Sequence, residues 1–439
     1  MRRIEGFERA REALSRLTST MSFPVSTALK RRLEELFDTA DPEQAVKSII
    51  NEVRNRGDAA IFDLTAKIDG VKLTSVEVPK NEISGARQKI DSELLSALKL
   101  AAERIGAFHK KQKDNVCREF AADGAGQFTR PLERVGIYVP GGTASYPSTV
   151  LMTAVPARVA GVKEIIVATP PGKDGAVPAA TLAAADIAGV DRVFRIGGAQ
   201  AIAAMAYGTK SVPRVDKIVG PGNIFVVLAK KLVFGEVDID GLQGPSEVMI
   251  IADDTADPEY CALDLLAQAE HDALALVVLV TTSRALAGEV ERELEKQLKD
   301  LSRQTIIADS LEKGVIALVD NLGEAIELAN LYAPEHLCLM VKDTDACLKK
   351  VNNAGCVLVG NYATVVLGDY IAGPSHVLPT GGTARFSSPL NITDFIKFIN
   401  TININEAGLK KLGEAVTALA KAEGLDAHAR AVAKRLQRD

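Results

Sequence analysis

The sequence predicts an α/β fold of two domains, each built on a parallel, doubly wound sheet. Apolar runs that end at Gly or Pro recur roughly every 25–30 residues between positions 134 and 236, and each precedes an Ala-rich or amphipathic helical segment. A second series of this type covers residues 247–380. Strands that alternate with helices are typical of βαβ units. A chain of 439 residues, 47% of them hydrophobic, is long enough for two or three such cores.

We expect the chain before the first of these runs to be mainly helical. Residues 4–17 place Ile, Phe, Ala and Leu on one stripe, which indicates a short amphipathic helix detached from the main body. Asp41 followed by Pro42 is typical of a helix N-cap and first helical position, so a helix should cover residues 42–70. Further helical segments are expected through residues 81–113.

The strands and helices of the two series are placed by their apolar runs. In the first series the expected strands are 135–139, 164–168, 192–196 and 215–219. In the second series the expected strands are 247–252, 275–281, 304–308, 337–341 and 356–359, with helices at 258–271, 284–300, 322–332 and 344–353. The cleft between two such domains is the default position for a ligand.

Three Gly-rich turns occur among these elements, at 140–143, 197–200 and 220–223. The last two connect an expected strand to a helix, where backbone N–H groups and the helix dipole favour phosphate. Gly at such positions is also ordinary turn chemistry, and the sequence has no Gly-x-Gly-x-x-Gly run. The two domains are therefore expected to be Rossmann-like with an incomplete dinucleotide fingerprint.

The C-terminal part of the chain has a third pattern. Residues 386–405 indicate an extended connector, followed by a helix at 406–422, a stop at Gly424 and a final helix from Asp426. A segment of this size is too small for a strong core of its own. We expect it to pack on another domain or on a partner subunit.

Composition and charge exclude several classes of protein. The net charge is −5 with both signs well mixed, so the sequence has no basic stripe for nucleic acid or anionic lipid. The N-terminal residues have early charges and no apolar h-region, which argues against a signal peptide, and no window offers the ~18 apolar residues that span a bilayer. The five cysteines form no Cys-x-x-Cys pair. A reduced, cytoplasmic protein without nucleic-acid or membrane partners is expected.

Four of the five histidines lie within seven residues of an Asp or Glu in Gly- or Ala-rich sequence, namely His271, His336, His376 and His428. Imidazole and carboxylate together can bind a divalent metal or transfer protons near neutral pH. One such pairing means little, but four of them favour convergence on one site. The fifth, His109, stands in a basic run and is expected to be a solvated surface residue.

Each candidate also has an ordinary interpretation. Gln268 and His271 share a helix face at a spacing that suits two ligands of one metal, although such pairs more often face solvent. Adjacent Glu335 and His336 can form a base and its orienting carboxylate, or merely a polar surface turn. Asp369 could ligate a metal, but its Gly-rich surroundings alone do not require this.

Taken together, these segments resemble the histidinol dehydrogenase family. The matching blocks run in order along nearly the whole chain: Arg134–Gly142, Gly197–Ala204, Val215–Asn223, Gly244–Val248, Asp264–His271, Pro334–His336, Gly368–Tyr370, His376–Thr380 and Glu423–His428. Such an ordered series excludes chance agreement. The segment 361–368 departs from many relatives, because it has neither the proline nor the acid that they carry there.

The resemblance implies an NAD-dependent, zinc-containing enzyme of the last steps of histidine biosynthesis, which oxidises L-histidinol through L-histidinaldehyde to L-histidine. It implies one zinc ion per subunit, held by Gln268, His271, Asp369 and His428. Substrate contacts would come from these ligands with Ser246, His336 and Glu423, and NAD contacts from Tyr138, Gln200 and Asn223. It also implies an intertwined homodimer with a shared active site, in which the C-terminal segment crosses and His428 completes the other subunit's site.

The chemistry expected of such an enzyme fits these residues. Hydride leaves an alcohol carbon as the hydroxyl proton is removed, so a general base is needed, and His336 is the candidate. Oxidation of the aldehyde needs its hydrate, and Glu335 is placed to activate water. Zinc would anchor the substrate rather than polarise the alcohol. A thiohemiacetal route through Cys338 is disfavoured, because burial in an apolar run raises a thiol pKa. His376 keeps a loop-supporting or substrate-adjacent role.

The expected domain boundaries combine these assignments: an N-terminal helical arm (1–24), a discontinuous first α/β domain with the metal and catalytic residues (25–137 and 247–385), a second α/β domain on the NAD side (138–246) and a dimer-crossing tail (386–439). Two other functions are compatible with the isolated motifs. One is a metal-dependent hydrolase that uses Glu335 to activate water. The other is a non-catalytic binding protein of two α/β lobes.

Overall fold

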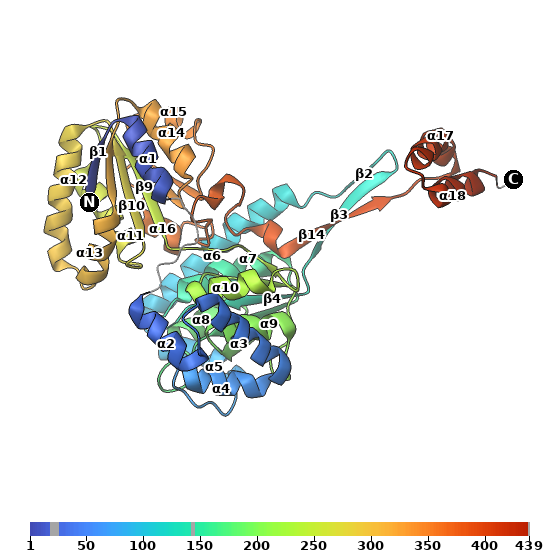
Figure 1. The fold of residues 1–439 in the computed structure, drawn as a ribbon, viewed down its shortest axis with the longest axis horizontal. Helices are drawn as coiled ribbons and strands as arrows, with labels where there is room; N and C mark the ends of the chain where they lie inside the picture. The colour runs from blue at the N-terminus through green and yellow to red at the C-terminus, as the bar shows by residue number, and fades with distance from the viewer. Residues whose placement is uncertain (18–25, 142–144, 438–439) are drawn as a thin grey trace.

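The computed structural model describes residues 1–17, 26–141 and 145–437. Figure 1 shows two α/β bodies and an arm that carries two C-terminal helices away from both. Each body contains a parallel sheet with helices on its two faces, which confirms the predicted fold class. Within the described ranges, no helix is both long and apolar enough to cross a membrane.

The first body is built on five parallel strands in the order β6-β5-β4-β7-β8. They are β4 (Arg134–Tyr138), β5 (Glu164–Thr169), β6 (Arg192–Arg195), β7 (Lys217–Val219) and β8 (Asp238–Ile239). Neighbouring residues of a strand face opposite layers, so Ile165 enters one core and Ile166 the other. One face is covered by α7 (Pro147–Ala160) and α8 (Ala179–Ala188), and the other by α9 (Gly198–Tyr207) and α10 (Ile224–Val233).

The second body is built on six parallel strands in the order β1-β11-β10-β9-β12-β13. They are β1 (Arg2–Glu5), β9 (Glu247–Ala252), β10 (Leu276–Thr281), β11 (Val315–Leu318), β12 (His336–Met340) and β13 (Cys356–Val359). One face is covered by α11 (Pro258–Ala269), α12 (Arg284–Gln297) and α13 (Gln304–Lys313). The other face is covered by α1 (Phe7–Leu17), α14 (Leu322–Tyr332) and α15 (Thr344–Leu348). The central strands β9, β10, β11 and β12 are apolar on both faces apart from residues at their ends, as burial between two helical layers requires.

The N-terminal segment belongs to this second body. Residues 2–5 form an edge strand parallel to β11, and α1 packs on α14 with Ala10 and Leu14 buried. The prediction of a detached helix is therefore wrong. The preceding strand extends the sheet, and α1 packs directly on the body that contains this sheet. The remainder of the expected arm, residues 18–24, lies outside the described residues.

The expected strand at 304–308 is also wrong, because these residues begin helix α13. Ile307 and Leu311, one helical turn apart, both enter the core beside α11. A short apolar run does not by itself distinguish a strand from a helix. The third strand of this series is β11, which follows Gly314.

The helices before β4 pack on the five-stranded sheet, whereas the sequence grouped them with the other domain. They are α2 (Thr27–Phe37), α3 (Pro42–Arg56), α4 (Asp58–Ile68), α5 (Lys80–Gly85) and α6 (Ser92–Val116), with a 3-10 turn at Ala86–Lys89. Side chains of α3 and α4, such as Ile49 and Ile61, share a core with α9, and Leu98 and Ile105 of α6 share one with α7. An apolar helix face can pack on either sheet, so the sequence pattern could not decide which domain these helices belong to.

His109 on α6 is fully buried, which corrects its expected place on the surface. Its Nδ1 lies 2.9 Å from the carbonyl oxygen of Ile105, one turn earlier. The neighbouring Lys110 side chain is 73% exposed, so the helix turns its basic residues outward and this one histidine inward. Burial lowers the pKa of His109, which favours the neutral imidazole.

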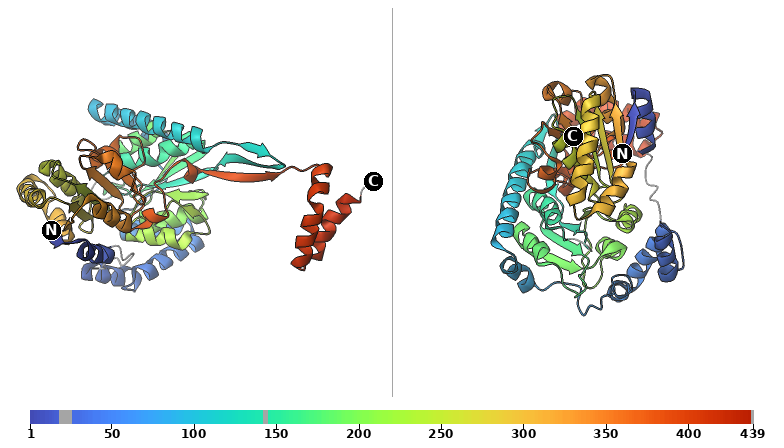
Figure 2. Two further views of the ribbon diagram at one scale, coloured as in Figure 1. Left: turned by 90° about the horizontal axis from the view of Figure 1, so that it is seen from above. Right: turned by 90° about the vertical axis from the view of Figure 1, so that its left-hand side faces the viewer.

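The arm is an antiparallel sheet that joins two distant parts of the chain. Strand β3 (Ala125–Pro131) pairs with β2 (Phe120–Ala122) on one side and with β14 (Ile396–Ile402) on the other. Beyond β14 come α17 (Glu406–Ala422) and α18 (Asp426–Leu436), which confirm the predicted C-terminal helices. The left view of Figure 2 shows this helical pair at the far end of the arm. The remaining elements are α16 (Val365–Tyr370) and 3-10 turns at Leu298–Asp300, Thr383–Arg385 and Ile392–Phe395.

Candidate active site

A cavity of about 490 Å³ lies where the two bodies meet. The five-stranded sheet lines it with turns at the carboxyl ends of its strands, such as Pro221–Asn223 after β7. The six-stranded sheet contributes the opposite ends of its strands, with Ser246 before β9 and His336 at the start of β12. Gln268 of α11 and Asp369 of α16 complete this group. Residues that are more than 100 positions apart therefore share one cavity.

His336 is held in a defined orientation beside two carboxylates. It is 4% exposed, and its Nδ1 lies 3.2 Å from the carbonyl oxygen of Glu247. Because a carbonyl only accepts, the neutral ring carries its proton on Nδ1 and leaves the Nε2 lone pair free. Nε2 lies 3.6 Å from Oδ1 of Asp369 at the cavity wall. Burial opposes protonation, but the charges of Glu335 and Asp369 prevail and raise the pKa of His336 to about 9.

Glu335 and Glu247 form a pair of buried carboxyl groups behind this imidazole. Oε2 of Glu335 lies 3.6 Å from Nδ1 of His336 and accepts a 2.7 Å hydrogen bond from the backbone N–H of Glu247. Oε1 of Glu247 accepts from the N–H of Gly381 at 3.2 Å. Burial raises the pKa of Glu335 to about 7, and burial together with the Glu335 charge raises the pKa of Glu247 to about 8. Both can therefore take up a proton near neutral pH.

Glu247 was not among the predicted site residues, although it lies in one of the blocks that match the family. Its signal was a carboxylate at the first position of an otherwise apolar strand, 247–252. Glu247 is 3% exposed, its carboxylate accepts from the backbone N–H of Gly381, and its own N–H donates to the carboxylate of Glu335. Cys338, two residues beyond His336, lies in the core, and burial raises the pKa of its thiol well above its ordinary value. It is not an activated nucleophile.

The candidate metal ligands of one chain line the same cavity. Nε2 of His271 lies 3.9 Å from Oδ2 of Asp369. Gln268 is 1% exposed, and neither atom of its amide has a hydrogen-bond partner among the described residues. An unpartnered buried amide costs roughly 1–3 kcal/mol, so a bound group that engages it is favoured. Over residues 1–17, 26–141 and 145–437, no three His, Cys, Asp or Glu side chains are grouped to hold a metal ion.

His376 supports the loop that carries Asp369. Its Nδ1 lies 2.7 Å from the backbone carbonyl oxygen of Asp369, and its Nε2 lies 3.3 Å from Oγ1 of Thr149 on α7. Burial lowers the pKa of His376, so the neutral ring is favoured. The imidazole thus bridges the two bodies beside the cavity.

The three candidate NAD contacts lie at the carboxyl ends of the five-stranded sheet, but they differ in accessibility. Asn223 lines the cavity, and its side-chain oxygen accepts from the N–H groups of Phe225 and Val226 at the start of α10. Tyr138 and Gln200 are nearly fully buried and do not line it. The Tyr138 hydroxyl accepts from the N–H of Gly198 at 3.0 Å. Both amide atoms of Gln200 are without hydrogen-bond partners in the described chain.

Glu423 and His428 do not reach this cavity in the same chain. Both lie in the pair of helices at the end of the arm, and both are exposed. Figure 1 shows this pair well separated from the two bodies. One chain therefore brings together Gln268, His271 and Asp369, but not the fourth predicted ligand.

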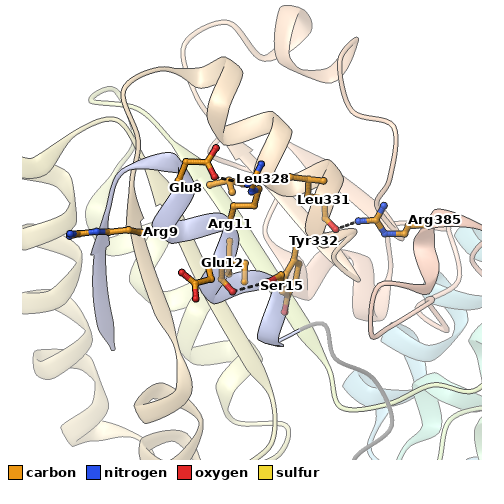
Figure 3. Close-up of a pocket in the computed structure, with 10 residues that line it drawn as sticks. Glu8, Arg9, Arg11, Glu12, Ser15, Leu328, Leu331, Tyr332 and Arg385 are labelled. Atoms are coloured by element: carbon orange, nitrogen blue, oxygen red, sulfur yellow. Dashed lines mark hydrogen bonds and ion pairs between the residues drawn. The ribbon is translucent and has the colours of Figure 1, made fainter.

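A second cavity, of about 610 Å³, lies between α1 and α14. Figure 3 shows its charged lining, which includes Arg9 and Arg11 of α1 and Arg385. None of the predicted site residues lines it. Its wall includes Tyr332, whose pKa is raised well above the ordinary value by burial and by the charges of Glu247 and Glu335. This cavity therefore lies close to the buried carboxyl groups of Glu247 and Glu335, but His336 does not line it.

A buried ion pair holds the turn after β7 against the segment that leads into β9. Lys230 of α10 donates to Asp240, to Oε1 of Gln243 at 2.9 Å and to the carbonyl oxygen of Gly220 at 3.1 Å. Asp240 in turn accepts from the N–H of Gly220 at 2.7 Å. Both charged side chains are 1% exposed. The pair fixes Asn223 and Ser246, which follow these segments, relative to each other.

Replacing Lys230 with Met should destabilise the protein by about 3–5 kcal/mol, because it leaves the Asp240 charge buried without a partner. Urea unfolding followed by circular dichroism measures this. The matched control is Lys231→Met, since Lys231 is 48% exposed and pairs with Glu43 at 3.3 Å on the surface. That change should cost less than about 1 kcal/mol. Equal unfolding midpoints for the two variants would contradict the assigned role of the buried pair.

Comparison with known proteins gives a consistent result along the whole chain. The model of a family described as histidinol dehydrogenase matches residues 33–436. A histidinol dehydrogenase from Dehalococcoides mccartyi strain CBDB1 is 57% identical over 441 aligned residues, which cover all of both chains. One from Deinococcus radiodurans is 51% identical and also covers both chains fully. The crystal structure of histidinol dehydrogenase from Elizabethkingia anophelis superimposes with a TM-score of 0.91 at 36% identity, covering 100% of this chain and 98% of that one.

Proposed function

The chain belongs to the histidinol dehydrogenase family, and on that premise we propose which of its residues carry out the reaction. The protein is an NAD-dependent oxidoreductase that oxidises L-histidinol in histidine biosynthesis. One observation chiefly supports the residue assignment. The buried Glu335–His336 pair opens onto a cavity lined by both bodies, with the imidazole Nε2 toward Asp369.

His336 is the proposed general base of the alcohol oxidation. The Glu247 carbonyl holds the proton on Nδ1, so Nε2 is available to accept the substrate's hydroxyl proton. Glu335 behind the ring stabilises the positive charge that this transfer creates. When Asp369 also binds a cation, its charge is less available to His336, and the pKa of the imidazole falls toward the neutral range in which a base is most effective.

Glu335 is the proposed base that activates water for hydration of L-histidinaldehyde. Its carboxyl group is buried beside His336, and burial brings its pKa to about 7, so it can accept a proton from water near neutral pH. The hydrate then offers a second hydroxyl proton to His336. The same imidazole would therefore serve both oxidations.

Replacing Glu335 with Gln should uncouple the two oxidations. We expect the aldehyde oxidation to slow by about 10²–10⁴-fold and the alcohol oxidation by less, because only hydration needs the carboxylate. The measured quantity is NADH formed per L-histidinol in a single turnover, which should fall from two toward one while an aldehyde-trapping hydrazine captures the intermediate. Equal slowing of both steps, with the stoichiometry unchanged, would rule out this role.

The proposed zinc site uses Gln268, His271 and Asp369 of one chain with His428 of the partner subunit. Imidazole and carboxylate are common zinc ligands, and the unpartnered amide of Gln268 fits a ligand role that is otherwise unusual for glutamine. When bound, zinc supplies a Lewis acid that anchors the imidazole and amine of L-histidinol. The residues of this chain then orient the carbinol toward His336.

NAD is proposed to bind along the carboxyl ends of the five-stranded sheet, in contact with Tyr138, Gln200 and Asn223. In doubly wound sheets this edge, where the strand order reverses, is the usual dinucleotide site. The buried amide of Gln200 has no partner in the described chain, which favours a ligand there. Bound NAD supplies the hydride acceptor. Ser246 and Glu423 are proposed to contact L-histidinol.

We further propose a homodimer in which the arm crosses to the partner. The arm and its helices expose large apolar side chains, among them Phe120 at 59%, Ile402 at 83% and Leu419 at 67%. Several large apolar side chains exposed on one extended segment favour an interface there. A crossing arm would bring Glu423 and His428 to the other chain's cavity.

The assignment as a whole is tested by metal analysis of the purified protein together with NADH absorbance during turnover of L-histidinol. We expect about one zinc per chain and two NADH per substrate. No NADH signal from folded, zinc-loaded protein would overturn the catalytic assignment and favour a hydrolase or a binding protein.

A further inference from the structure

Asp69 stands at the end of α4 with a carboxylate that the surrounding protein does not engage. It follows Ile68, the last residue of the helix, and α4 shares its core with Tyr138 and α9. Its Oδ2 is buried and has no hydrogen-bond partner within the described ranges. Burial raises the pKa of Asp69 to about 6, although the nearby Arg32 opposes this. Arg32 itself donates to the Ile68 carbonyl at 3.1 Å.

Tyr138 and Gln200 belong to the same layer of the first body as α4. Helix α4 packs on α9, which carries Gln200, and shares a core with Tyr138, whose pKa is raised by burial and also by the charge of Asp69. The Tyr138 hydroxyl accepts from Gly198, and a Cβ on Gly198 would lie 2.9 Å from Oε1 of Gln200. That Gln200 amide is 99% buried and unpaired among the described residues. Asp69 and Gln200 thus carry buried polar atoms without partners among the described residues, in the layer that Tyr138 also enters.

Many dinucleotide-binding sheets carry an acidic residue at the end of the second strand, but this chain has two prolines there. In such sheets a carboxylate at the end of the second strand receives the hydroxyls of the adenosine ribose. The corresponding strand here is β5, which runs into Pro170 and Pro171, and the next acid, Asp174, accepts from the N–H of Ala176 within its own turn. Pro170 is packed so tightly that a Cβ on Gly141 or Gly197 would lie 2.6 Å from it.

We propose that Asp69 takes over this role: its carboxylate binds the ribose hydroxyls of the adenosine half of NAD and excludes the 2′-phosphate of NADP. The inference rests on the NAD placement proposed above. An ionised carboxylate only accepts, which suits two vicinal hydroxyls and repels a phosphate. Arg32 lies beside it and would attract that phosphate once the carboxylate charge is removed.

The test is equilibrium binding of NADH and NADPH to the dimeric holoenzyme, followed by nucleotide fluorescence without L-histidinol. For Asp69→Asn we expect the Kd of NADH to rise about tenfold and the Kd of NADPH to fall, so that their ratio shifts by at least about 30-fold. Adding Arg32→Ala to this variant should reverse most of the gain in NADPH affinity.

The matched control is Asp63→Asn on the same helix, because Asp63 is exposed and pairs with Arg56 at the surface. Its NADPH-to-NADH ratio should equal that of the unmodified protein. If Asp69→Asn does not fold, Asp69→Ser provides the same measurement with a smaller side chain. An unchanged ratio in a folded Asp69 variant, or an equal loss of both affinities, would overturn the inference.

The failure of this inference can be distinguished from failure of the NAD placement on which it rests. Gln200→Ala should weaken NADH and NADPH equally, because its amide would contact a part common to both. If Gln200→Ala weakens both nucleotides but Asp69→Asn leaves their ratio unchanged, the placement stands and the role of Asp69 is wrong. If neither variant alters nucleotide binding, both are wrong.

Discussion

Replacing His336 with Asn should lower kcat about 10³-fold while L-histidinol still binds. The asparagine amide can donate to the Glu247 carbonyl as Nδ1 does, but it has no basic nitrogen to replace Nε2. Loss of a general base typically costs about 10²–10⁴-fold in rate. Stopped-flow NADH formation gives the rate, and calorimetry gives the affinity for L-histidinol. A folded variant with kcat within tenfold of the unmodified enzyme would exclude His336 as the base.

The comparison variant is His376→Asn, which alters another imidazole beside the same cavity. His376 bonds the Asp369 carbonyl and Thr149, so its loss should loosen the Asp369 loop and raise KM more than it lowers kcat. Loss of His336 should therefore act mainly on kcat, and loss of His376 mainly on KM.

The dependence of the rate on pH should also report on the role of His336 as the base. A protonated imidazole cannot accept the hydroxyl proton, so activity should fall as the pH decreases through the pKa of His336. Glu335 and Asp369 raise that pKa, and a cation on Asp369 offsets the contribution of Asp369, so in the zinc-loaded enzyme the fall should lie near neutral pH. In the His336→Asn variant, this fall in activity with decreasing pH should be absent.

Mixing two inactive variants, His428→Ala and His336→Asn, should restore activity if the arm crosses between subunits. In a mixed dimer one site would combine the intact His336 of one chain with the intact His428 of the other. Random exchange makes about half of the dimers mixed, and each has one good site of two, so about a quarter of the unmodified activity is expected. Activity and bound zinc are measured after subunit exchange, with mixed dimers confirmed by two affinity tags.

The matched control mixes His336→Asn with His271→Ala. Both residues lie in the same body, so no exchange of arms can build an intact site, and activity should stay absent. Recovery in this control, or none in the first mixture despite proven exchange, would exclude a site shared across the dimer.

Much of the fold was predictable because parallel strands buried on both faces appear as apolar runs. The pairing of β14 with β3 was not, since it joins Ile399 to Phe128 across more than 250 residues without a local signal. The docking of α3 and α4 was equally hidden, because an apolar helix stripe is complementary to either sheet. The error at 304–308 has a similar origin, because the short apolar run of α13 fits the two-residue repeat of a strand as well as the 3.6-residue repeat of a helix.

The candidate site was more predictable than the fold, but only through motifs. Gln268, His271, His336 and Asp369 were selected by residue type and spacing, and one cavity holds all four. Glu247 and Asp69 were not selected, because their importance comes from burial without a full set of partners. Burial of a polar atom depends on which segments pack over it, and no short stretch of sequence records that.

The two sheets face the cavity with opposite ends of their strands, and this determines where a segment can be inserted. The six-stranded sheet turns the amino ends of β9 and β12 toward the cavity, so its carboxyl ends face away from the chemistry. Asp253 ties two of the turns at that far edge together, accepting from the N–H of Lys342 at 2.9 Å. The turn after β10, at residues 282–283, is free of that tie, and an insertion for a reporter there is compatible with turnover provided that Ser283 is kept as the N-cap of α12. The same insertion before β9 or β12 would displace Ser246 or His336 and abolish turnover.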